Sequence, residues 1–309
     1  MTDSTKSMHA HWLGQLRKLN PATGRGACHG KAPHKPLLLL SLLDQIEDGE
    51  LTRQTFTRDA GLVLRFRTYG SLTSDRWPTR LDLKMPFYHL KSQGFWTAHQ
   101  ADGAPARSPE SCVACTLHED FFRAAMDPGL RLKARLLLID TYFTPSEQVA
   151  LLESMGLGDY RDATHPRRTD VIREAEKAAK RKGRSARFAV QVVARYRFTC
   201  ALTGLSCMTT EGASIVDAAH IDPWSRSRND ELTNGLALCK NAHWSFDQGL
   251  WSVNPHGTIL VAQPRFTEAG PDALRLIPYT NRPLNFAPST TLRPDPAHFA
   301  EHRKRWGLV

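Results

Sequence analysis

The stretch that decides the fold runs from Ser214 to Val253 and reads SIVDAAHIDPWSRSRNDELTNGLALCKNAHWSFDQGLWSV. Its pattern of apolar and polar residues predicts a strand over 215–221, then a polar loop and a second short strand over 236–239. The pair Asn234–Gly235 is typical of a turn leading into that second strand. A helix is predicted to begin at Asn241, which gives the order strand, loop, strand, helix.

Three residues of this stretch are candidates for chemistry. Asn234 follows His220 by 14 residues, and His243 follows Asn234 by 9. Asp247 lies four residues after His243, so both side chains point to one face of the predicted helix. An imidazole and a carboxylate together suit a divalent cation. We expect Mg²⁺ or Mn²⁺, and less selectively Zn²⁺ or Ni²⁺.

These residue types fit the hydrolysis of a phosphodiester bond. A neutral His220 can accept a proton from water, because imidazoles in general exchange protons near working pH. A divalent cation at His243 neutralises charge at the phosphate and at the leaving oxygen. Asn234 is expected to form hydrogen bonds across the loop and to fix the orientation of His220.

The same stretch resembles the HNH, or ββα-metal, nuclease family. The residues that carry the resemblance are Ala218-Ala219-His220-Ile221, Pro223-Trp224, Asn234-Gly235-Leu236, Leu238-Cys239, and His243 with Phe246-Asp247 and Gly249. The resemblance implies that His220 is the general base, Asn234 the structural asparagine and His243 a metal ligand. Asp247 matches a position that supplies a second ligand in some members.

One position departs from the family pattern. Many members carry Asp or His immediately before the base, and this chain has Ala219 there. Asp217 is an alternative metal ligand. It points away from His220 on a regular strand, so this role requires a β-bulge. A further alternative is a non-catalytic DNA-binding protein whose HNH fold is inactive.

Residues 1–146 are predicted to form a mixed α/β domain. Leu37 to Leu43 and Ile46 form a buried helix, with Pro36 in its first turn and Gly49 after its end. A second amphipathic helix over 130–143 closes the domain. Between them, apolar residues surround a predicted turn at 92–94, with a strand or short helix before it and a strand after it.

Two motifs of this domain are similar to sulfur-binding domains that read phosphorothioate DNA. They are Ala32-Pro33-His34-Lys35-Pro36 and Met85-Pro86-Phe87-Tyr88-His89-Leu90, the latter followed by Gln93-Gly94-Phe95-Trp96. Sulfur is larger and less hydrated than oxygen. A protein site that recognises it in a phosphorothioate therefore needs a small apolar pocket beside cationic hydrogen-bond donors. The resemblance implies DNA contacts by Met85, Pro86, His89, His34 and Lys35.

Two of these positions differ from what the resemblance leads us to expect. Met85 stands where an aromatic residue is expected, and Lys35 stands where arginine is commoner. A methylated base or unmodified DNA is therefore an alternative target. The proline motifs have a structural alternative too, in which Pro36 only starts a helix and Pro86–Phe87 is core.

Residues 147–188 are predicted to form a basic helical linker. The segment 167–187 carries nine Lys or Arg residues and three acidic ones. Five of the basic residues share one broad helical face: Arg173, Lys177, Lys180, Arg181 and Arg184. We expect this face to follow DNA phosphates, and the alternative is a solvated linker helix.

The composition of the chain limits which binding partners and locations are expected. The chain has 309 residues, a formal charge of +10 and a pI near 9.5, which favours a polyanionic partner. We expect no signal peptide, no membrane span, a cytoplasmic location and six reduced cysteines. The pair Cys112–Cys115 is expected to be two ordinary thiols, and structural zinc is the alternative because it needs four ligands.

The sequence therefore predicts an α+β protein with an N-terminal DNA-reading domain, a basic helical linker and a C-terminal ββα-metal nuclease domain over 189–309. The predicted function is a metal-dependent, restriction-type endonuclease that acts on double-stranded, phosphorothioated DNA. A sequence-specific homing or nicking enzyme is an alternative. One HNH site cuts one strand, so double-strand cleavage leads to the hypothesis of a homodimer.

Overall fold

The computed structural model describes residues 3–79, 81–162, 170–209, 212–263, 265–286 and 293–308. The chain divides into two compact units, Met1–Ala186 and Arg187–Val309. Helices and small antiparallel sheets make up both units, so the predicted α+β class is confirmed. In the described ranges, no helix is long and apolar enough to cross a bilayer.

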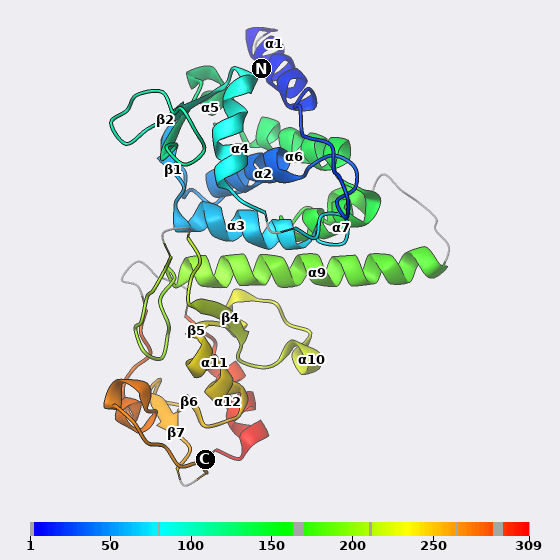
Figure 1. Ribbon diagram of the computed structural model, residues 1–309. Coiled ribbons are helices and arrows are strands. Elements are labelled where there is room, and N and C mark those ends of the chain that lie inside the picture. Colours follow the sequence, from blue (N-terminus) through cyan, green and yellow to red (C-terminus); the bar gives the residue numbers. More distant parts are fainter. Residues whose placement is uncertain are drawn as a thin grey trace. The chain divides into compact units, whose positions relative to one another are not determined.

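The first unit is mainly helical (Figure 1). Its helices are α1 (Asp3–Arg17), α2 (His34–Glu47), α3 (Ala60–Ser71), α4 (Lys84–His89), α5 (Glu119–Met126), α6 (Pro128–Tyr142), α7 (Pro145–Ser154) and α8 (Asp159–Asp162). Its strands form a sheet in the order β1 (Thr55–Thr57), β3 (Ala114–Leu117), β2 (Trp96–His99). A 3₁₀ turn, η1 (Leu90–Gln93), joins α4 to β2 through Gly94, which has φ 76°.

Helix α2 is the centre of the first unit and contacts α3, α4, α5 and α6. Its residues 36–46 are all buried, as the run of leucines predicts. Gly49 follows its end in the left-handed region, at φ 71°, where glycine is favoured. His34 and Lys35 therefore stand at the first turn of a helix that is fixed by the core.

A buried ionic network fixes α2 against its neighbours. Arg65 of α3 donates to Asp44 of α2 at 2.9 Å and to Glu50 at 2.9 Å. Arg135 of α6 also donates to Asp44, at 3.1 Å. Removing one member would leave uncompensated buried charge, which costs roughly 3–5 kcal/mol. The network thus ties the helix that carries His34 and Lys35 to α3 and α6.

The predicted domain boundaries, 146 and 188, stay a prediction. The structure has a helix, α7, over Pro145–Ser154, and its Val149 and Leu151 are buried. Helix α9 (Asp170–Arg195) contains the division between the two units. A Cβ on Gly183 of α9 would lie 2.2 Å from the carbonyl oxygen of Ala150, so this glycine allows α9 to approach α7 closely.

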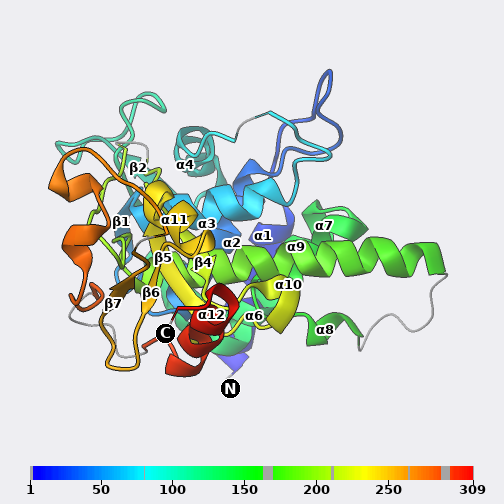
Figure 2. The same ribbon diagram turned by 90° about the horizontal axis from the view of Figure 1, so that it is seen from below.

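The second unit is built around the predicted hairpin and helix. Strands β4 (Val216–His220) and β5 (Gly235–Cys239) pair antiparallel, and α11 (Lys240–Asp247) packs against both (Figures 1 and 2). The remaining elements are α10 (Trp224–Ser227), η2 (Leu232–Asn234), β6 (Trp251–Val253), β7 (Ile259–Val261), η3 (Asp272–Leu274), η4 (Ile277–Tyr279) and α12 (Pro296–Trp306). The predicted order of strand, loop, strand and helix is therefore confirmed.

Candidate active site and DNA-reading site

His220 is the last residue of β4 and lies opposite Gly235 of β5. The ring of Phe188 stacks on its imidazole, with the centroids 3.9 Å apart and the planes inclined by 4°. A Cβ on Gly235 would lie 3.1 Å from Phe188 Cζ and 2.5 Å from Val192 Cγ2. Glycine at this position therefore leaves the space that the stacked phenyl ring occupies.

The imidazole of His220 also contacts a carboxylate. Its Nε2 lies 2.9 Å from Asp230 Oδ1, and the two side chains are 21% and 23% exposed. Asp230 belongs to the polar loop between the two strands, ten residues after His220. Sequence reasoning missed Asp230, and it placed Phe188 on a helix leading into the site without predicting its contact with His220. No periodicity connects a loop carboxylate or a distant helix residue to the end of a strand.

Asn234 is completely buried and holds the loop between β4 and β5. Its Oδ1 accepts from the backbone N–H of Asp222 at 2.8 Å, and its Nδ2 donates to the carbonyl of Asp222 at 2.9 Å. The same Nδ2 donates to the carbonyl of Asn229 at 3.0 Å. Both ends of the loop that follows His220 are thus fixed by one carboxamide, and a buried carboxamide needs such partners.

His243 and Asp247 face each other on α11, as their spacing predicts. His243 Nε2 lies 3.5 Å from Asp247 Oδ2. Trp251 anchors this helix by donating from Nε1 to the carbonyl of Ala242 at 3.2 Å and to Ser245 Oγ at 3.1 Å. One imidazole nitrogen and one carboxylate oxygen fit a hydrated Mg²⁺ or Mn²⁺, which takes few protein ligands and completes its shell with water and phosphate oxygens.

The third predicted ligand lies in a different setting. Asp217 forms an ion pair with Lys240; the Lys240 side chain is exposed and that of Asp217 is partly exposed. Ala219 is buried against the sheet, so the position before His220 offers no ligand atom. Among the described residues, no group of three or more His, Cys, Asp and Glu side chains is placed to hold a metal. A role for Asp217 stays a prediction.

The predicted DNA-reading residues of the first unit lie on α2 and α4. Burial and the nearby ammonium groups of Lys35 and Lys91 lower the pKa of His89. Burial also lowers the pKa of Lys35. In the described part of the chain, no carboxylate forms an ion pair with Lys35, Lys91 or His89. The two lysines therefore give this cluster a positive charge without a carboxylate partner, which suits a phosphate.

Apolar groups belong to the same short helix as His89. Pro86 is buried, whereas Met85 is 45% exposed. The next residue, Phe87, is core, and its carbonyl accepts from Trp96 Nε1 at 2.8 Å. The motif therefore contains both the structural residues of the alternative interpretation and one exposed, polarizable thioether.

A hydrogen-bond hub that the sequence did not indicate orients Lys35. Its Nζ donates to Asn20 Oδ1 at 2.6 Å, and Gln93 Nε2 donates to the same oxygen at 2.7 Å. Asn20 lies in the loop between α1 and α2, and Gln93 ends η1. Three separate segments meet here, so only the folded structure relates these residues. His34 makes an edge-to-face contact with Trp77 at 5.5 Å, and burial lowers its pKa.

Two family models match parts of the chain. Residues 200–254 match that of the HNH endonuclease, and residues 9–160 match that of the ScoMcrA-like DNA sulfur-binding domain. The chain carries an HNH endonuclease domain and a DNA sulfur-binding domain. Both predicted resemblances, to the HNH nucleases and to the DNA sulfur-binding domains, are confirmed.

Solved structures with a related domain content give weaker likenesses. The sulfur-binding domain of SprMcrA complexed with phosphorothioated DNA is 23% identical, with TM-score 0.39, over 52% of this chain and 99% of that one. The phosphorothioation-dependent restriction endonuclease ScoMcrA is 12% identical, with TM-score 0.30, over 76% and 94%. The modification-dependent TagI restriction endonuclease is 23% identical, with TM-score 0.32, over 40% and 38%. This chain thus spans about 38% of the TagI chain.

The assignment rests on the two family models, because all three TM-scores lie below 0.5. None of the curated proteins compared with the chain matches it.

Two lysines of the predicted basic face of α9 lie close to glutamates. Lys177 pairs with Glu174 at 2.6 Å, and Lys180 lies 3.8 Å from Glu153. Arg181 and Arg184 are exposed on this helix. The side chain of Arg173 lies outside the described residues. DNA contact by Lys177, Lys180, Arg181 and Arg184 stays a prediction.

The buried cysteines of both domains pack as small side chains. Cys112 and Cys115 of the sulfur-binding domain are buried, with their sulfur atoms 4.0 Å apart. In the HNH domain, a hydrogen bond with Cys239 lowers the pKa of the Cys200 thiol to about 5 and raises that of Cys239. Cys207 is exposed.

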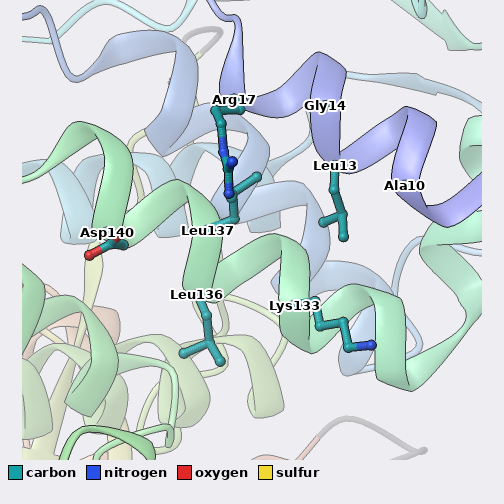
Figure 3. Close-up of a pocket in the computed structure, with 8 residues that line it drawn as sticks. All are labelled: Ala10, Leu13, Gly14, Arg17, Lys133, Leu136, Leu137 and Asp140. Atoms are coloured by element: carbon teal, nitrogen blue, oxygen red, sulfur yellow. The ribbon is translucent and has the colours of Figure 1, made fainter. Parts of the chain in front are cut away.

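The sulfur-binding domain also has a groove of about 540 Å³ between α1 and α6 (Figure 3). Its lining is mixed, with leucines beside charged side chains: Leu13, Leu136, Leu137, Arg17, Lys133 and Asp140. None of the predicted DNA-reading residues lines this groove, so it is separate from the cluster around Lys35.

Proposed function

We propose that this chain is a restriction-type endonuclease that hydrolyses phosphorothioate-containing double-stranded DNA with a divalent cation. The observation that carries the proposal is the presence in one chain of an HNH domain and a DNA sulfur-binding domain. The site geometry supports it. His220 ends the strand against which the helix bearing His243 packs, and an exposed thioether shares a short helix with a residue of an uncompensated basic cluster.

In this mechanism His220 accepts the proton of the attacking water. Asn234 keeps the loop after His220 in place, so the imidazole holds its orientation towards the scissile phosphate. His243 and Asp247 would hold Mg²⁺ or Mn²⁺, which stabilises charge on the phosphate and on the leaving oxygen when bound. Asp217 would join them only after releasing Lys240.

In the DNA-reading step Lys35, His89 and His34 bind the phosphate. The exposed side chain of Met85 contacts the sulfur, and the buried Pro86 shapes the short helix that presents it. Lys177, Lys180, Arg181 and Arg184 add contacts to neighbouring phosphates. Charge-based contacts bind all DNA, so discrimination depends on the apolar contact with sulfur.

The test compares plasmids with and without phosphorothioate linkages, incubated with the full-length protein and Mn²⁺. We expect faster cleavage of the modified plasmid and no cleavage by His220→Ala. Equal cleavage of both plasmids would refute the sulfur specificity and favour a reader of methylated or unmodified DNA. Absence of cleavage together with intact DNA binding would instead indicate that the HNH domain is inactive. Cleavage of both strands would require two HNH sites, and light scattering with DNA tests for a homodimer.

A further inference from the structure

We infer that Asp230 is a positioning residue that holds the general base in one tautomer, with the proton on Nε2 of His220 and a basic lone pair on Nδ1. The inference rests on the proposed function of His220. It adds the atom that accepts the proton and the residue that selects this atom. The observation that carries it is the distance of 2.9 Å between His220 Nε2 and Asp230 Oδ1.

The tautomer follows from the chemistry of the two groups. An ionised carboxylate only accepts hydrogen bonds, so the ring nitrogen next to it must carry the hydrogen. A neutral imidazole has one N–H, which leaves Nδ1 as its acceptor. Across the described ranges, Asp230 is the sole hydrogen-bond partner of the His220 ring. Nδ1 is therefore the nitrogen left to take a proton from water.

The loop delivers Asp230 to this place through its two neighbours in the sequence. The carbonyl of Asn229 accepts from the buried Asn234 at 3.0 Å. The side chain of Asn229 accepts from the backbone N–H of Glu231 at 2.7 Å. Asp230 therefore lies between two residues whose backbone is fixed by hydrogen bonds. Its carboxylate is held close to the imidazole of His220 in advance.

Stacking fixes the remaining freedom of the ring. The phenyl ring of Phe188 covers one face of His220 at 3.9 Å and nearly parallel, so the imidazole cannot rotate about its Cβ–Cγ bond without losing this contact. Asp230 defines which ring edge is occupied. When His220 takes up a proton, the carboxylate also stabilises the resulting imidazolium, as a paired charge does in any partly buried site.

The first test reads the tautomer directly in the full-length protein. Long-range ¹H–¹⁵N correlation spectra distinguish the two neutral forms of histidine, and the signal of His220 is assigned from its loss in His220→Ala. We expect the Nε2–H form alone in the wild type and a mixture that includes the Nδ1–H form in Asp230→Ala. A wild-type Nδ1–H tautomer, or Nε2–H alone in Asp230→Ala, would overturn the inference.

The second test measures cleavage of phosphorothioate plasmid by Asp230→Asn. We expect kcat to fall roughly 10- to 100-fold, because positioned proton transfer contributes about 10²- to 10⁴-fold and the base itself remains. KM for DNA and the affinity for Mn²⁺ should stay unchanged, since Asp230 acts through His220. Glu231→Gln is the matched control, because it neutralises the adjacent loop carboxylate, and it should cleave like the wild type.

The outcomes separate this inference from the proposed function. A tenfold loss of Mn²⁺ affinity in Asp230→Asn would make Asp230 a metal ligand and refute the positioning role. Full cleavage by Asp230→Asn, together with inactive His220→Ala, would refute the inference and leave the proposed function intact. If the wild type and His220→Ala are equally inactive, the proposed function fails. The tautomer spectra then still test whether Asp230 holds His220 in the Nε2–H form. Melting temperatures of all variants check that they fold.

Discussion

Phe188 lies parallel to His220 at 3.9 Å because the residue opposite His220 in the hairpin, Gly235, has no side chain. An added Cβ would approach Phe188 and Val192 to 3.1 Å and 2.5 Å. Gly235→Ala should therefore displace the stacked ring. We expect a loss of about 1–3 kcal/mol of unfolding free energy from overpacking. Slower cleavage should accompany it, because the imidazole loses its support.

Denaturant unfolding and plasmid cleavage measure the two effects. Gly14→Ala is the control, because it lies in helix α1, has no heavy atom within 4 Å of the added Cβ and stands in the sulfur-binding domain. It should raise stability by up to about 1 kcal/mol, as alanine does in helices, and leave cleavage unchanged. Wild-type stability and cleavage in Gly235→Ala would mean that Phe188 has room to move.

Asn20 is predicted to contribute to DNA reading through Lys35. Asn20→Ala removes the oxygen that accepts from both Lys35 and Gln93. We expect the Kd for a phosphorothioate duplex to rise roughly 2- to 12-fold, the equivalent of one hydrogen bond at about 0.5–1.5 kcal/mol. Lys35→Ala should weaken binding further and reduce the salt slope by about one.

Fluorescence anisotropy over a series of salt concentrations measures both variants. Lys133→Ala, which removes an exposed lysine of the groove between α1 and α6, is the control and should bind like the wild type. If Asn20→Ala binds modified and unmodified duplexes as the wild type does, Lys35 needs no support from this loop.

Stability of the HNH domain should depend on pH through His302. This residue is buried, its Nε2 donates to the carbonyl of Phe246 at 3.1 Å, and its Nδ1 lies 3.0 Å from Ser252 Oγ. Burial lowers the pKa of His302 from 6.5 to about 4. The unfolded chain thus takes up a proton first as the pH falls, so stability decreases between pH 6.5 and pH 4, by up to about 3 kcal/mol.

Urea unfolding between pH 7.5 and pH 4.5 tests this sign. His302→Gln should be less stable than the wild type at pH 7.5, because it loses the ring stacked on Phe246. Its stability should nevertheless fall less steeply below pH 6.5. Parallel pH curves for the two proteins would show that His302 does not titrate in this window.

Local pattern predicted the elements that carry the candidate site. The leucine run of α2 and the spacing of His243 and Asp247 on α11 each depend on neighbours in the sequence, and both elements formed as expected. The turn at 92–94 also appears, with Gly94 in the left-handed region that the predicted turn requires.

The partners of those residues were not predictable in the same way. Asp230 reaches His220 only because Asn234 folds the intervening loop, and Phe188 reaches it from α9. Asn20 meets Lys35 and Gln93 from a third segment. Such contacts depend on tertiary packing, which a single sequence without its relatives does not encode in any periodic signal.

His243 and Asp247 are predicted to form the protein's share of the metal site. Removing either ligand should weaken Mn²⁺ binding about 10-fold or more, because a hydrated divalent cation relies on few protein ligands and each contributes strongly. Isothermal titration of Mn²⁺ into the full-length protein without DNA measures this directly. His243→Ala and Asp247→Ala should also lose cleavage, with partial recovery at high Mn²⁺.

The control variant is His256→Ala, which removes an exposed imidazole of the same domain and should change neither binding nor cleavage. The variant Asp217→Asn tests whether Asp217 is a third protein ligand of the cation. If Asp217 stays paired with Lys240 in solution, this variant binds Mn²⁺ as the wild type does. A loss equal to that of Asp247→Ala would show that Asp217 turns to the cation. Unaltered Mn²⁺ binding by both His243→Ala and Asp247→Ala would place the cation elsewhere and remove the metal role of α11.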